Sequence, residues 1–106
     1  GPRRDQPGYD AVIQAEAGLM SITGESAGPP LRLGVAIADL VSGMFAAQGI
    51  LAALYWRDAL GGGLGQVVDV SLMEASFAML ESAAPAYLLT AAVLTLSSRA
   101  AAVRRS

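Results

Sequence analysis

The stretch that decides the fold is GVAIADLVSGMFAAQGILAAL, from Gly34 to Leu54. Its side chains are apolar or small almost throughout, and Asp39 is the one charged residue among them. The pattern predicts a long helix from about Ala38 to Leu60, which ends at the glycines of GGGLG because glycine disfavours helix. The sequence therefore raises one question first, which is why an acid stands near the start of so apolar a helix.

Two environments suit the apolar helix. About 20 apolar residues at roughly 1.5 Å per residue are long enough to cross a bilayer. Two features argue against a membrane span. Placing an ionised Asp39 in the bilayer costs roughly 3 kcal/mol on insertion scales, and Ser42 and Gln48 add further polar groups. These features favour the core of a soluble α/β protein, and we expect no membrane.

Asp39 itself has two interpretations. Near the first turn of the helix it faces unpaired backbone N–H groups and the positive end of the helix dipole, which favour its charge by about 0.3–1 kcal/mol. It is then a capping acid. The alternative is a carboxylate nucleophile that attacks an activated acyl group and forms a mixed anhydride. The pattern alone leaves both open.

Composition removes several classes of function. With 54% hydrophobic and 15% charged residues, the chain is too apolar to be disordered. Its net charge of -2 argues against nucleic-acid binding, which needs clustered positive charge. Because histidine and cysteine are both absent, the chain by itself supplies no zinc site and no Ser-His-Asp triad, and we expect no metal.

Before the apolar stretch, helical spacing of apolar residues predicts a helix from Tyr9 to about Met20. The glycines and prolines of TGESAGPP then predict a loop over 23–30. This part of the chain therefore reads as a helix followed by a loop.

After the glycines, the β-branched run QVVDVSL predicts a strand from Gln66 to Leu72. Ser71 is placed to cap a following helix, with Glu74 completing a capping box. That helix should run to about Leu89 and be strained or broken near Pro85.

The predicted order is therefore helix, loop, long helix, one strand and helix, in an α/β class. A single strand leaves its backbone hydrogen bonds unmade, so its partners must lie in other sequence or another subunit. We therefore expect this chain to be an incomplete domain, a piece of a longer protein.

Three segments in order carry a resemblance: QPGYDAVIQAEAGLMSITGE, GPPLRLGVAIADLVSGMFAAQGILAAL and GQVVDVSLMEA. Together they resemble the central part of the family III CoA-transferases, which include the formyl-CoA and carnitine-linked enzymes. The resemblance covers residues 1–88, as a partial catalytic domain. Residues 89–106 do not resemble the family sequences, and we expect them to form a divergent, frayed tail.

The resemblance implies a site. The family's Asp, which attacks the acyl-CoA thioester and carries CoA as an aspartyl thioester, falls on Asp39. The active-site aromatic falls on Tyr9, with Asp10 as the neighbouring acid. Gly8 would let the backbone approach the pocket, although a simple turn explains Gly8 as well. Coenzyme A then enters as acyl-CoA, and a carboxylic acid accepts it.

The resemblance also implies the surroundings of the site. It implies a doubly wound α/β large domain, an interlocked homodimer and a cytoplasmic location. The parts of the family that bind most of the CoA and that close over the intermediate are missing here, so we expect this chain alone to have little activity and poor solubility.

Two rival functions stay in view. An α-methylacyl-CoA racemase belongs to the same superfamily but has a histidine at the position of Tyr9. Tyrosine has a pKa of about 10 and is a poor base at neutral pH, so the transferase is favoured. The other rival is a small membrane-anchored or assembly protein that uses its apolar helix as the anchor.

Overall fold

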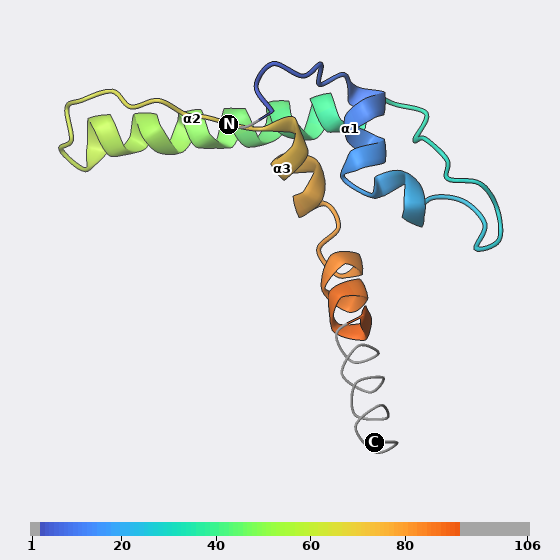
Figure 1. Ribbon diagram of the computed structural model, residues 1–106. Helices are drawn as coiled ribbons and strands as arrows, with labels where there is room; N and C mark the ends of the chain where they lie inside the picture. The colour runs from blue at the N-terminus through green and yellow to red at the C-terminus, as the bar shows by residue number, and fades with distance from the viewer. Residues whose placement is uncertain (1–2, 92–106) are drawn as a thin grey trace, which may run out of the picture.

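The computed structural model describes residues 3–91 as a set of helices joined by loops (Figure 1). The helices are α1 (Asp10–Glu16), the 3-10 helix η1 (Leu19–Ile22), α2 (Ile37–Ala59) and α3 (Leu72–Ala78), and residues 83–91 form a further helical segment. The long helix expected over residues 38–60 is confirmed almost to the residue.

The core lies where α1 and α3 pack against the first half of α2 (Figure 1). Its buried apolar residues come from every one of these elements and are mostly small or medium in size: Ile13, Ala17, Leu19, Ala38, Val41, Ala75 and Leu80. Small side chains at a helix junction let the backbones approach closely, so this core is compact but modest in area.

The second half of α2 extends beyond this core (Figure 1). Its large side chains Ile50, Leu51, Tyr55 and Trp56 are at least half exposed. The helix has a mean hydropathy of 1.6 over its most apolar window, of which 17% is buried, and its length and composition would also suit a membrane span. An apolar surface of this kind is typical of an interaction site, and the rest of residues 3–91 leaves it uncovered.

The strand expected over residues 66–72 is wrong for this structure. Residues 66–71 have no regular secondary structure, and the described residues 3–91 contain no strand. This segment lies along α2, and a Cβ placed on Gly49 would stand 2.7 Å from Val68 Cγ1. A strand needs a neighbouring strand for its backbone hydrogen bonds, and residues 3–91 provide none, so the α/β architecture is not formed within them.

Gly18 divides the first predicted helix. The helix expected over residues 9–20 ends after Glu16, and the chain continues as η1. Gly18 has φ 92°, a left-handed conformation that ends a helix and that glycine adopts without strain.

The cap expected from Ser71 is confirmed. The backbone N–H of Glu74 donates to Ser71 Oγ at 3.3 Å, at the start of α3. Within the described residues, the Glu74 carboxylate returns no hydrogen bond to Ser71, so half of the capping box is formed.

The break expected near Pro85 lies earlier in the chain. α3 ends at Ala78, residues 79–82 form turns, and the helix resumes over residues 83–91. Pro85 therefore stands in the first turn of the second segment, where a missing N–H leaves no helical hydrogen bond unmade.

Replacing Gly18 with alanine should lower the free energy of unfolding by roughly 1–2 kcal/mol, because a Cβ disfavours the left-handed backbone. The new Cβ would meet Leu80 Cδ1 at 3.6 Å, an ordinary contact, so backbone strain is the cause. Urea unfolding followed by circular dichroism measures the change. As a control, Gly43→Ala, inside α2 with no atom near the added Cβ, should stabilise the protein by about 0.5–1 kcal/mol. Equal effects of the two variants would contradict the strain at Gly18.

Replacing Ser71 with alanine removes the acceptor for the Glu74 N–H and should destabilise the protein by about 1 kcal/mol. Ser71→Asp keeps an acceptor at this position and should retain the parental stability. Thermal unfolding of the three proteins checks the prediction, and identical melting temperatures for the alanine and aspartate variants would show that the cap is unimportant.

Candidate active site

Asp39 is the third residue of α2, and its side chain is exposed. Within residues 3–91 it makes no hydrogen bond and no ion pair. The N-cap position of α2 is Ala36, and no N-cap side chain caps the helix. A carboxylate in the first turn of a long helix lies near the positive end of the helix dipole, which favours its charge. Because it has no partner in the described part of the chain, it is accessible to a substrate.

Asp10, rather than Asp39, accepts a hydrogen bond from a backbone N–H at the start of α2. The backbone N–H of Ala38 donates to Asp10 Oδ1 at 2.9 Å, across a separation of 28 residues. Asp10 is 8% exposed, so this hydrogen bond is shielded from water. The acid that accepts a hydrogen bond at the start of α2 therefore comes from α1, and Asp39 keeps only the favourable interaction with the helix dipole.

The same hydrogen bond brings two parts of the predicted site together. Tyr9 precedes Asp10 in the chain and Asp39 follows Ala38, so each lies next to one partner of the bonded pair. Tyr9 occupies the N-cap position of α1 and is 76% exposed, and its phenol has no partner within residues 3–91. The backbones of Tyr9 and Asp39, 30 positions apart in sequence, thus lie on adjoining segments.

Gln14 is a component of this region that sequence reasoning missed. It is fully buried, and its Nε2 donates to Asp10 Oδ2 at 2.8 Å. One signal was available, because Gln14 stands four residues after Asp10 on the same helix face, between Ile13 and Ala17 of the apolar stripe. A polar residue in such a stripe must find hydrogen-bonding partners inside the protein.

Arg32 supplies the positive charge nearest to Asp10. Its Nη2 lies 3.7 Å from Asp10 Oδ2, and its side chain is 52% exposed. An ion pair at this distance and exposure contributes little to stability, so the hydrogen bonds of Asp10 matter more than its charge pairing.

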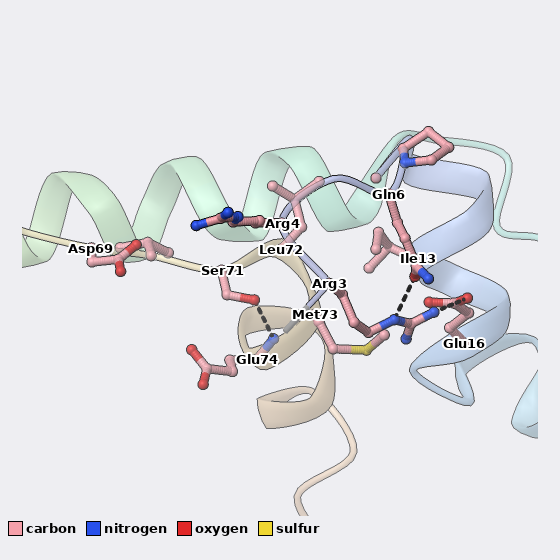
Figure 2. A pocket seen from close by; sticks show the side chains of 13 residues that line it. Arg3, Arg4, Gln6, Ile13, Glu16, Asp69, Ser71, Leu72, Met73 and Glu74 are labelled. Atoms are coloured by element: carbon pink, nitrogen blue, oxygen red, sulfur yellow. Dashed lines mark hydrogen bonds and ion pairs between the residues drawn. The ribbon is translucent and has the colours of Figure 1, made fainter. Parts of the chain in front are cut away.

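A cleft of about 620 Å³ lies beside this region, between residues 3–8 and the start of α3 (Figure 2). Gly8 lines it, whereas Tyr9, Asp10 and Asp39 do not. Arg3 crosses the cleft and is held by Gln6 and Glu16 through hydrogen bonds of 2.7 and 2.6 Å. In residues 3–91, no group of three or more acidic side chains gathers where it would hold a metal ion.

Gly8 does not need to be glycine for steric reasons within this structure. A Cβ at this position would meet Ile13 Cδ1 at 3.8 Å, an ordinary contact. The approach of substrate to the backbone at Gly8 stays a prediction.

The carboxyl group with a clear pKa shift lies outside the site. A side-chain hydrogen bond from Arg57 lowers the pKa of Asp58 and raises that of Arg57. Both side chains are exposed near the end of α2, so this pair takes no part in the Asp39 region.

The sequence profile of CoA-transferase family III matches residues 1–104. Among curated relatives, succinyl-CoA–D-citramalate CoA-transferase of Chloroflexus aurantiacus is 42% identical over 90 residues, which is 85% of this chain and 22% of that enzyme. Succinyl-CoA:glutarate CoA-transferase of Mus musculus is 43% identical over 89 residues, 84% of this chain and 20% of the relative. The chain thus spans about a fifth of the length of the curated relatives it matches.

Solved structures agree with these relatives. A CaiB/BaiF family protein from Brucella suis superposes with a TM-score of 0.79 at 35% identity, over 86% of this chain and 24% of that one. A hypothetical protein from Mycobacterium tuberculosis superposes with a TM-score of 0.71 at 31% identity, over 83% and 24% of the two chains. By sequence and by fold, the chain belongs to CoA-transferase family III.

Proposed function

We propose that this chain is the catalytic segment of an enzyme that moves coenzyme A between an acyl-CoA and a carboxylic acid, with Asp39 as the nucleophile. The observation that carries the proposal is the division of labour between two acids. Asp10 accepts the Ala38 N–H, whereas Asp39 stays exposed and without a partner in residues 3–91. An acid without a structural role in the first turn of an apolar helix suits covalent catalysis.

The proposed reaction proceeds through two anhydrides and needs no redox step. The Asp39 carboxylate attacks the thioester carbonyl, which forms a mixed anhydride and releases the CoA thiolate. The thiolate then attacks the Asp39 carbonyl, which forms the aspartyl thioester and releases the donor acid. The acceptor carboxylate repeats the two steps in reverse order, so that Asp39 is regenerated and the acceptor leaves as its CoA thioester.

Tyr9 and Gly8 belong to the substrate side of this proposal. The ring of Tyr9 is exposed on the segment next to Asp39, where it is free to contact the acyl group. Gly8 leads from Tyr9 to the cleft of Figure 2 and offers backbone without a side chain. Asp10 is the acid next to Tyr9 in this proposal. Its carboxylate oxygens accept hydrogen bonds from Gln14 and from the backbone of Ala38.

The names of the relatives suggest the first substrates to test. They include succinyl-CoA, D-citramalate and glutarate, so we propose succinyl-CoA as donor and a short dicarboxylate as acceptor.

Two features support the proposal that this chain is part of a larger enzyme: the uncovered half of α2 and the short length of the chain relative to the family enzymes. We propose that the parent enzyme, meaning the longer protein that carries this segment, has the doubly wound α/β domain, forms an interlocked homodimer and works in the cytoplasm. In it, α2 is a core helix, and the chain by itself has little activity.

The Asp39 intermediate is testable in the parent enzyme. After incubation with succinyl-CoA, hydroxylamine should convert the aspartyl thioester to a hydroxamate that peptide mass spectrometry places on Asp39. Asp39→Ala should abolish this adduct and lower turnover by about 10³-fold or more, because the covalent route is lost. Glu25→Ala, which removes an exposed acid away from the cleft, should keep the adduct. An adduct on a different residue, or transfer without one, would refute the proposal.

The Tyr9 ring is testable separately. Tyr9→Ala should reduce turnover roughly tenfold by loosening the acyl group, and it should leave the melting temperature unchanged because the side chain makes no described contact through its hydroxyl. Tyr9→Phe should retain activity if the ring alone matters. Tyr87→Ala, which removes an equally exposed tyrosine, is the control and should leave kcat unaltered.

A further inference from the structure

Gln14 connects α1 to the segment that leads into α2. Its side chain is completely buried, yet every one of its polar atoms has a partner. The partners are the backbone of Leu33, the backbone of Val35 and the carboxylate of Asp10. One amide thus holds two points of the segment before α2 and also the acid that caps this helix.

The orientation of the Gln14 amide follows from its backbone partners. The Leu33 N–H donates to Gln14 Oε1 at 3.0 Å, and Gln14 Nε2 donates to the Val35 carbonyl oxygen at 3.1 Å. A backbone N–H only donates and a carbonyl only accepts, so the reversed amide would lose both bonds. The second N–H of Nε2 therefore has to point at Asp10 Oδ2, 2.8 Å away.

Asp10 continues the connection to the reactive end of the helix. With Oδ2 occupied by Gln14, its Oδ1 accepts the N–H of Ala38, the residue immediately before Asp39. The segment from Leu33 to Ala38 is thus fixed at Leu33 and Val35 by Gln14 and at Ala38 by Asp10. The Asp39 carboxylate makes no hydrogen bond in residues 3–91, so the backbone at the start of α2 sets the point and direction from which this side chain extends.

We propose that Gln14 and Asp10 act as a pair of positioning residues for Asp39, a role that rests on the function proposed above. They fix the direction of the first turn of α2 and so set the place of the nucleophile against the thioester. Reacting groups must be aligned to within a fraction of an ångström, and a displacement of about 1 Å lowers a rate by about 10²-fold. A buried hydrogen-bonded pair is suited to this task because neither partner is free to move to another acceptor.

The substitution Gln14→Glu tests the pair with almost no change in size. It keeps an acceptor for the Leu33 N–H, removes the donors to Val35 and Asp10, and places a second carboxylate against Asp10 Oδ2. In the parent enzyme, kcat should fall by about 10²-fold, with little change in KM for succinyl-CoA. The rate of hydroxamate formation at Asp39 should fall in parallel.

The double substitution Asp10→Asn with Gln14→Glu restores the pair with donor and acceptor exchanged. The amide introduced at position 10 donates to the carboxylate introduced at position 14, while its oxygen still accepts the Ala38 N–H. The bond from Leu33 is kept as well, whereas the bond to Val35 and the weak ion pair between Arg32 and position 10 are lost. The double variant should therefore recover most of the kcat lost in Gln14→Glu and in Asp10→Asn when each is made alone, which independent effects would not do.

Gln48→Glu is the matched control, since it makes the same chemical change at an exposed position of α2. It should leave kcat and the adduct rate unchanged. Melting temperatures of all variants separate positioning from stability. If Gln14→Glu lowers the melting temperature while its folded fraction forms the adduct at the parental rate, the pair is structural only and the proposal is wrong.

The remaining outcomes also decide the question. If Gln14→Glu does not fold, the double variant carries the test, and a folded double variant with kcat as low as that of Asp39→Ala would overturn the proposal. If the unaltered parent enzyme forms no adduct at Asp39, the proposed function fails instead. The two failures are distinguishable because only the second removes the intermediate from the unaltered protein.

Discussion

The hydrogen bond from the Ala38 N–H to Asp10 is the constraint on which the rest of the structure depends. The first N–H groups of a helix have no partner within it, and α2 begins after Ala36 without an N-cap side chain to supply one. A carboxylate from α1 fills this need from inside the protein. The bond joins the two helices and decides which of the two acids stays available for chemistry.

Asp10 and Asp39 show how burial assigns different roles to the same functional group. Both stand in the first turn of a helix, yet Asp10 is buried among donors and Asp39 faces solvent. The acid with satisfied oxygens acts as a structural acceptor, and the other acid is the one to which we assign the attack on the substrate.

Residues 3–91 leave two surfaces without a partner. The apolar side chains on the second half of α2 stay uncovered, and residues 66–71 have no neighbouring strand to bond. The segment at residues 66–71 lies instead along α2, where Gly49 leaves room for Val68. The chain spans about a fifth of its curated relatives, and its local helices form around a small core all the same.

The sequence by itself determined the features that depend on near neighbours. The apolar run and the glycines set the bounds of α2, and Ser71 marked the start of α3, because helix propensity and capping act within a few residues. It also pointed to Tyr9, Asp10 and Asp39 through the family resemblance. The tertiary structure alone decided that Asp10 caps α2, that Gln14 fixes the segment before it, and that residues 66–71 form no strand. These features depend on contacts between residues far apart in the chain, up to 28 positions for Asp10 and Ala38, and no local pattern specifies such a contact.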